Sequence, residues 1–438
     1  MDRRLTQIAP LQQKDKGPAY LSLLSETLRT KSPNLVNDVK LLVRVVVTED
    51  HVGLVVARQV LTELSKSLDN NLVDISEVKK AIINDTLEIV QPQLVSFEEQ
   101  ATSLRYQLAD ILEQEEEWSE AARVLMGISM ESGNRAWPEQ DRFRVYVRVV
   151  RLLLEDQDSV QAEMYYNRAA LLVHQNTDKE LGLMFKLCQA KISDHTRKFQ
   201  DAASRYHELS WVAEIDEEER AHMLSAAVTC AVLAPAGPAR SRILASLCRD
   251  ERTSQLPNYN ILSKMFLDHI LRPSEVKEFE ATLQPHQLAK IAQSSSDRLA
   301  STRNDDQSAQ EPGASTRVGP STVLDRAVLE HNVLSCSKIY SNISFSGLGA
   351  LLDLTPGAAE TMARKMIEQG RLRGWIDQVD KLIWFEGKVE DDDAQGKAGG
   401  LGDVSQEVEE TGAPFTKGWD RQIRLTAGNV EIVVQRIL

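Results

Sequence analysis

Eight histidines and four cysteines are the residues of this 438-residue chain most suited to metal or nucleophilic chemistry. The segment His207-Glu208-Leu209-Ser210-Trp211 begins like the helix of a zinc protease, in which two histidines four residues apart bind the metal. Trp211 stands where the second histidine is required. The chain also lacks a His-x-His pair with a downstream Asp, which is the ligand pattern of a metal-dependent isopeptidase. The sequence therefore predicts no metal site.

The other candidates for chemistry are equally incomplete. Gly347 and Gly349 lack the third glycine of a dinucleotide-binding loop, and no Gly-Lys-Ser or Gly-Lys-Thr turn is present to bind a phosphate. His331 could act as a base for the thiol of Cys336, but both lie on or just after a helix expected to face the core, with no acid fixed beside them. The four cysteines have no zinc or disulfide spacing, so we expect reduced, buried thiols. Neither an enzyme nor a cofactor is predicted.

The composition is that of an ordinary globular protein working inside the cell. Apolar residues make up 42% of the chain, and its length suits about two to four domains. Lys and Arg number 51 against 65 Asp and Glu, a net charge of −14, which argues against a surface built for nucleic acid or anionic lipid. The charged start of the chain lacks the apolar core of a secretory signal, and no stretch approaches the roughly 20 apolar residues that span a bilayer. We therefore expect a soluble, intracellular protein.

The positioning elements are mainly α-helices with a period of about 40 residues, a tetratricopeptide-like repeat. Small residues mark the second helix of each pair, and Ala162 lies 40 residues after Ala122 and 41 before Ala203. An amphipathic helix opens each pair, near 104–112, 143–154 and 181–192. A fourth pair is expected from Leu224 to Leu247, and earlier helices near 18–30, 35–49 and 53–67. These patterns predict a helical-repeat solenoid over residues 1–292.

A different pattern follows a Ser-, Gln-, Gly- and Pro-rich segment at 293–321, which reads as a flexible linker. Residues 322–386 alternate helix, short strand, two helices and a β-hairpin, which is the order of a winged helix. Thr355 and Pro356 suit the N-cap and first position of its second long helix, and Gly370 suits the end of that helix. The hairpin strands are expected near Trp375–Gln378 and Leu382–Phe385.

The last 52 residues divide into an acidic insert and a helix. Residues 387–415 are Gly-rich, acidic and without periodicity, so we expect disorder there. Nine acids and two lysines fall within 386–410, so half of the net charge lies in this stretch. Residues 416–438 follow with an apolar stripe at helical spacing, formed by Trp419, Ile423, Val430, Val434 and Ile437. Such a stripe favours burial against other helices.

Only the winged helix could bind nucleic acid. Arg364, Lys365, Arg371 and Arg373 on and after its second long helix would suit phosphate contacts. Residues 321–386, however, hold seven Lys and Arg against eight Asp and Glu. A DNA-reading domain usually has a strongly basic face, so pairing with other proteins is the favoured use of this domain.

A helical-repeat array leading into a winged helix and then one C-terminal helix resembles the PCI family, which is shared by the proteasome lid, the COP-nine signalosome and a translation initiation factor. The resemblance is carried by Leu324–Asn332, Leu348–Leu352, Trp419–Ile423 and above all Gly374–Asp380, and it is closest to the signalosome members. It covers nearly the whole chain. It implies that residues 1–292 include the helical part of the PCI domain.

What the resemblance implies is a non-catalytic scaffold. The signalosome removes a ubiquitin-like modifier from cullins in cullin-RING ubiquitin ligases, and its catalytic zinc belongs to another subunit. The winged helix would join other signalosome subunits through a strand edge at Leu382, Ile383, Trp384 and Phe385. The C-terminal stripe would enter a shared helical bundle, and the solenoid would reach the cullin and its RING partner. A sister subunit of the proteasome lid, a free nucleic-acid-binding winged-helix protein and an enzyme in its own right remain the alternatives.

Overall fold

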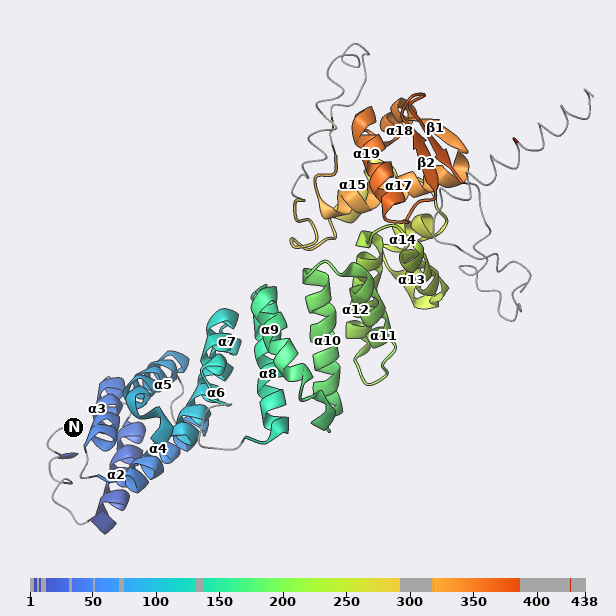
Figure 1. Cartoon of the computed structure of the whole chain (residues 1–438). Helices are drawn as coiled ribbons and strands as arrows, with labels where there is room; N and C mark the ends of the chain where they lie inside the picture. The colour runs from blue at the N-terminus through green and yellow to red at the C-terminus, as the bar shows by residue number, and fades with distance from the viewer. Residues whose placement is uncertain are drawn as a thin grey trace, which may run out of the picture. The chain divides into compact units, whose positions relative to one another are not determined.

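Helices predominate in the computed structural model (Figure 1). It describes residues 4–5, 8, 13–30, 34–49, 52–70, 75–130, 137–291, 317, 319–386 and 426. The predicted fold class, a helical-repeat solenoid leading into a winged helix, is confirmed. The predicted linker, the acidic insert and the C-terminal helix lie almost wholly outside the described residues. None of the described helices is long and apolar enough to cross a membrane.

The first helices match three expected ones and add one that the sequence did not reveal. Helices α2 (Gln13–Thr30), α3 (Leu35–Thr48) and α4 (Leu54–Asp69) correspond to the segments predicted near 18–30, 35–49 and 53–67. Helix α5 (Ser76–Val90), followed by the 3₁₀ turn η1 (Gln91–Ser96), was not predicted. Its middle is Asn84-Asp85-Thr86, three weak helix formers, and Thr86 occupies a buried position by donating its hydroxyl to the Ile82 carbonyl.

Three helical repeat pairs pack side by side in the middle of the chain (Figure 1). A residue in the left-handed region turns the chain inside each pair: Glu116 (φ 61°), Gln157 (φ 64°) and Arg197 (φ 61°). These equivalent residues are 41 and 40 positions apart, which confirms the period and corrects the predicted alignment by one residue. Ala162 therefore matches Ala121 and Ala202. The first pair is α6 (Glu98–Gln114) and α7 (Trp118–Met126), the second is α8 (Glu139–Glu155) and α9 (Ser159–Ala170), and the third is α10 (Lys179–His195) and α11 (Phe199–Ser210).

Ion pairs join successive repeats at a nearly constant sequence separation. Lys80 pairs with Glu115 at 2.9 Å, Arg148 with Glu113 at 2.6 Å, and Lys191 with Glu155 at 2.8 Å. The partners are 35, 35 and 36 residues apart. Since these pairs are partly exposed, solvent screens them, and the apolar interior between helices carries most of the stability.

The array ends in shorter helices that lead to the winged helix. Helices α12 (Glu217–Leu233) and α13 (Pro238–Arg249) form the predicted fourth pair, followed by η3 (Glu251–Gln255), α14 (Tyr259–Phe266) and α15 (Pro273–Glu280). An isolated β-bridge joins Lys290 to Thr322, at the start of the next helix. This bridge fixes the two described ends of the chain that flank the predicted linker.

The winged helix has the predicted element order, and its caps are the predicted residues. It comprises α17 (Val323–Ile339), β1 (Asn342–Ser344), α18 (Phe345–Leu352), α19 (Pro356–Glu368), β2 (Gly374–Asp377) and β3 (Leu382–Phe385). Thr355 caps α19 by accepting the Ala358 N–H, with Pro356 at the first position. Gly370 (φ 68°) ends α19 while the Arg371 N–H donates to the Met366 carbonyl.

The three strands form an antiparallel sheet in the order β1-β3-β2. Ile383 and Phe385 of β3 are buried with α17, α18 and α19 side chains in the core of this domain. Gly374 has to be glycine, because a Cβ atom there would lie 2.3 Å from the Trp384 carbonyl oxygen. The close approach places Trp375 directly opposite Trp384.

Candidate protein-interaction site

The sheet order corrects the predicted interaction edge. We expected Leu382, Ile383, Trp384 and Phe385 to offer an open strand edge, but β3 is the central strand and pairs with β1 on one side and β2 on the other. Ile383 is fully buried and Phe385 is 5% exposed. The main chain of β3 is therefore already paired within this domain. Ile383 and Phe385 face the domain core, whereas Leu382 and Trp384 are half-buried on the other face of the sheet.

The longer open edge belongs to β2. The Phe385 N–H donates to the Ser341 carbonyl on the β1 side, whereas the Glu386 N–H donates to the Arg373 carbonyl on the β2 side. Hydrogen bonding alternates along an antiparallel strand. The backbone groups of Arg373, Trp375 and Asp377 therefore point toward β3, whereas the backbone N–H of Ile376 points outward. No strand in the described part of the chain pairs with that outer side. The edge can accept a further strand.

Aromatic and apolar side chains accompany this edge. The Trp375 and Trp384 rings stack with centroids 5.9 Å apart and planes 7° apart, and Trp375 remains 49% exposed. At the hairpin tip, Val379 is 90% exposed. The Asp377 carboxylate holds the tip by accepting the N–H groups of Val379 (2.9 Å) and Asp380 (3.2 Å). A fixed, exposed tryptophan is typical of a residue that anchors a protein interface.

Three consecutive polar residues of α17, missed as a group from the sequence, attach the winged helix to the repeats. Glu330, His331 and Asn332 are all buried. Glu330 accepts the Ala236 N–H from the turn between α12 and α13. Asn332 accepts the Leu271 N–H at 2.9 Å and donates to the Leu271 carbonyl at 3.3 Å. One turn of α17 thus binds two loops of the repeat array.

His331 contacts both sides of the same junction. Its Nε2 lies 2.9 Å from the His269 carbonyl, and its Nδ1 lies 3.2 Å from a nitrogen of the buried Arg240 guanidinium. A carbonyl only accepts and a guanidinium only donates, so Nε2 carries the proton and Nδ1 is the acceptor. Burial and then the Arg240 charge lower the pKa of His331 to about 4. Burial raises the pKa of Cys336 to about 11, so these two residues form a structural core and not a reactive pair.

Acid should therefore weaken this junction in a specific way. The unfolded pKa of histidine is about 6.5 and the folded pKa is about 4. The stabilisation is complete above the first value and is lost as the pH falls toward the second, by about 2 kcal/mol at pH 5. His331→Gln, which keeps a donor for the His269 carbonyl, should reduce the loss between pH 7 and 5 by that amount in urea unfolding followed by tryptophan fluorescence. Equal pH dependence of the two proteins would contradict the assignment.

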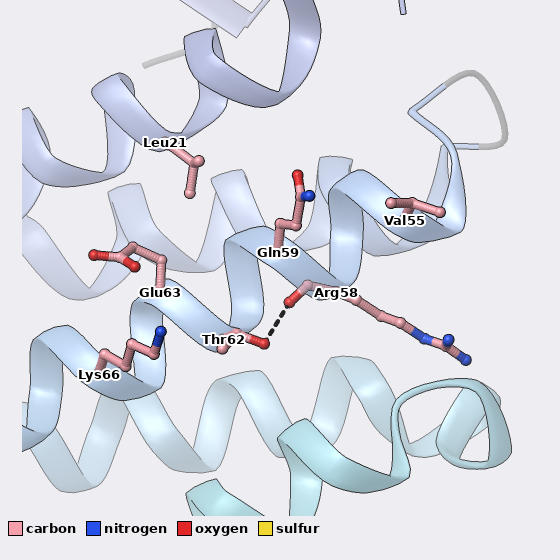
Figure 2. A pocket seen from close by; sticks show the side chains of 7 residues that line it. All are labelled: Leu21, Val55, Arg58, Gln59, Thr62, Glu63 and Lys66. Atoms are coloured by element: carbon pink, nitrogen blue, oxygen red, sulfur yellow. Dashed lines mark hydrogen bonds between the residues drawn. The ribbon is translucent and has the colours of Figure 1, made fainter. Parts of the chain in front are cut away.

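The remaining candidates for chemistry have structural roles in the described residues. The His207 Nε2 faces Asp250 at 3.4 Å and the Trp211 indole N–H at 3.3 Å. No group of three metal-ligating side chains occurs in the described part of the chain. All four cysteines are free, as predicted; Cys188, Cys230 and Cys336 are buried as expected, whereas Cys248 is only half-buried. A hollow of about 490 Å³ beside α4 (Figure 2) holds no nucleophile paired with a base, since the Thr62 hydroxyl donates to the Arg58 carbonyl.

Arg371 and Arg364, which are among the basic residues proposed for phosphate contacts, pair with acids of the same domain. Arg371 forms a two-point ion pair with Glu330, and Arg364 lies 3.9 Å from Glu368 on the same helix. Arg371 is therefore not available to a nucleic acid. The predicted bundle residues Trp419, Ile423, Val430, Val434 and Ile437 lie outside the described residues, so their role stays a prediction.

Known proteins match both halves of this architecture. The family model "PSMD12/CSN4, N-terminal" matches residues 12–218, and the PCI domain model matches residues 304–386. The chain is 39% identical to COP9 signalosome complex subunit 4 of Drosophila melanogaster, over 97% of this chain and 91% of that protein. It is 41% identical to the Arabidopsis thaliana subunit 4, over 89% and 92%, and 40% identical to that of Emericella nidulans, over 85% and 86%.

These similarities extend through the repeats, the junction and the winged helix, and they agree with the resemblance carried by Gly374–Asp380. The motifs predict the fourth subunit in particular, and its relatives confirm that prediction. The chain belongs to the COP9 signalosome complex subunit 4 family.

Proposed function

We propose that this chain is a non-catalytic scaffold subunit of a signalosome. In that role it supports removal of a ubiquitin-like modifier from cullins by holding other subunits in place, while the active site lies in another subunit. The observation that carries the proposal is the open β2 edge of a winged helix that is firmly attached to an array of helical repeats. The family relationship supports the same reading. Such a complex would work in both cytoplasm and nucleus.

The proposed domains follow from the same role. Residues 1–292 form the solenoid with the helical part of the PCI domain, 322–386 form the winged helix, and 416–438 form a helix that joins a bundle of partner helices. The stretches 293–321 and 387–415 connect them. The winged helix pairs with neighbouring PCI subunits through the β2 edge, which replaces the β3 edge expected from the sequence.

We further propose that the solenoid docks the cullin and its RING partner. Helix α9 supports a docking role because two apolar side chains are exposed one turn apart on its outer side: Val160 is 76% exposed and Met164 53% exposed. Counted from the left-handed turn residues, the same two positions are Ser119 and Arg123 in α7, and Gln200 and Ser204 in α11. The neighbouring repeats thus keep polar residues where α9 exposes apolar ones. A local apolar surface of this kind suits contact with a protein.

Reconstitution tests the proposed function directly. The signalosome would be assembled from purified subunits with and without this chain, and complex formation and cullin cleavage scored together. We expect both to be lost without it. Cleavage by this chain alone would overturn the non-catalytic role, and exclusive recovery of proteasome-lid subunits in a pulldown would favour the sister assignment.

Blocking the β2 edge should weaken pairing with a neighbouring PCI subunit. In Ile376→Pro the outward N–H is removed while the β2–β3 hydrogen bonds of Trp375 and Asp377 remain, which is the position at which a strand tolerates proline. Loss of one or two intermolecular main-chain hydrogen bonds, together with the proline ring in the path of the incoming strand, should reduce affinity at least tenfold in titrations with the purified partner.

Ile376→Ala is the matched control, because it removes the same partly buried side chain and keeps the N–H group. We expect its affinity to stay within about threefold of the parent protein, since less than about 1 kcal/mol of pairing energy would be affected. Equal weakening by the two variants would show that side-chain packing and not edge pairing holds the partner.

A further inference from the structure

Arg371 lies where the winged helix is joined to the repeats. It follows the turn that ends α19 and comes three residues before β2 begins at Gly374. Its guanidinium donates to both carboxylate oxygens of Glu330, one of them at 3.1 Å, and to the Ala236 carbonyl at 3.3 Å. Its Nε donates to the Gln369 side chain at 2.8 Å. Each of the three guanidinium nitrogens therefore donates at least one hydrogen bond.

The contacts form a closed ring of hydrogen bonds across three segments. The Ala236 N–H donates to Glu330 at 3.2 Å, Glu330 accepts from Arg371, and Arg371 donates back to the Ala236 carbonyl. The ring joins the α12–α13 turn, helix α17 and the segment that leads into β2. In sequence, Arg371 is 135 residues from Ala236 and 41 residues from Glu330. The Arg371 and Glu330 side chains are only 18% and 8% exposed. Such partly buried, charge-assisted contacts are strongly directional.

The other polar contacts between the two parts attach α17, and Ala236 and Ile270 of the repeat loops also pack against the winged-helix core. Asn332 and His331 attach α17 to the loops at Leu271 and His269, but neither touches α19 or β2 in the described contacts. Arg371 links the segment that leads into β2 directly to the α12–α13 turn and to α17 through side-chain hydrogen bonds. A lysine could not reproduce the two-point contact with Glu330, because an ammonium group lacks the planar fork of a guanidinium.

We propose that Arg371 is a positioning residue that fixes the direction of the open β2 edge relative to the last helical repeats. The ring with Glu330 and Ala236 lets the winged helix present that edge to a neighbouring PCI subunit in one orientation. This inference rests on the proposed function for its purpose, but the orientation itself is a property of the free chain. The two can therefore fail separately.

The test measures orientation in the full-length chain by pulsed electron spin resonance between two nitroxide labels. One label replaces Ser246 on α13 and the other replaces Val379 at the tip of the β2–β3 hairpin, and both positions are exposed. Genetically encoded label sites leave the native cysteines in place. We expect Arg371→Met to at least double the width of the distance distribution and Arg371→Lys to give an intermediate width. Arg364→Met should leave it unchanged, because the ion pair of Arg364 with Glu368 lies within α19.

The near-ultraviolet circular dichroism of the stacked Trp375–Trp384 pair separates loss of orientation from unfolding of the winged helix. Broadening with this signal intact supports the proposal, whereas broadening with the signal lost means that the domain has unfolded and overturns it. An unchanged distribution in Arg371→Met overturns it as well. Because Arg371→Met no longer holds the β2 edge in one direction, its affinity for a purified PCI partner should fall at least tenfold. A broadened distribution in a chain that joins no signalosome would leave the positioning role standing and reject the proposed function.

Discussion

Deletion of residues 416–438 is expected to abolish incorporation of this chain into a signalosome while the repeats and the winged helix stay folded. The deleted segment carries the apolar stripe Trp419, Ile423, Val430, Val434 and Ile437. Burying five such side chains against partner helices would supply on the order of 10 kcal/mol before the cost of association is subtracted. Co-purification with the other subunits measures the loss. Far-ultraviolet circular dichroism and the thermal midpoint of the truncated chain show whether its helices persist.

Substitutions within the segment show whether assembly depends on its apolar stripe or only on the segment being present. Alanine at the five stripe residues should reproduce the deletion. Alanine at Arg421, Arg424, Glu431 and Gln435, which fall on the opposite side of the same helical period, should leave assembly within about threefold of the parent. Normal incorporation of the stripe variant would remove the bundle role from this segment. Equal failure of the two variants would point to loss of the helix itself.

Local signals in the sequence account for most of the fold that could be predicted. The period of about 40 residues rests on small residues such as Ala121 and Ala202, which are fully buried between helices. The ends of α19 were predictable because Thr355, Pro356 and Gly370 each satisfy a backbone requirement at their own position. Such requirements depend on neighbours in sequence, so they are readable without the tertiary structure.

The interaction edge could not be predicted, because sheet order depends on pairing between distant segments. Strand β1 has only three residues, and its partner β3 lies 40 residues further along the chain, at Leu382–Phe385. Two adjacent hairpin strands read from sequence give no sign of which of them receives a third. Once β1 pairs with β3, the free edge passes to β2. An error of one strand in order thus moves the proposed interface to another set of backbone groups.

The junction was hidden for a similar reason. Glu330, His331 and Asn332 look like ordinary polar residues on a helix, and their partners Ala236, Arg240 and Leu271 lie 94, 91 and 61 residues away. Charge counting treated Arg371 as a free cation, although Glu330 neutralises it within the fold. The only usable signal was three consecutive polar residues inside a helix expected to face the core. Buried polar groups are rarely left unpaired, so that signal calls for partners elsewhere in the chain.

Replacing Asp194 by leucine should detach the segment at 284–291 from the repeats. The Asp194 carboxylate is 8% exposed and accepts two hydrogen bonds from the Gln287 amide, at 3.0 and 3.2 Å. It also lies 3.2 Å from Nε2 of His286, whose ring stacks on His195 with centroids 4.0 Å apart. Asp194→Leu leaves the buried Gln287 amide without its acceptor, so the expected loss of stability is about 3 kcal/mol.

Hydrogen exchange followed by mass spectrometry locates that loss. Because the segment ends in the bridge between Lys290 and Thr322, exchange should accelerate at the Ile291 and Val323 amides as well as within 284–291, while α6 to α9 keep their protection. Asp194→Asn keeps one acceptor oxygen and should cost about 1 kcal/mol. Asp201→Leu, which removes an exposed carboxylate from the adjacent helix α11, should change exchange only near its own turn. If exchange accelerated uniformly along the whole chain in Asp194→Leu, Asp194 would support the general fold. It would then have no specific role in attaching residues 284–291 to the repeats.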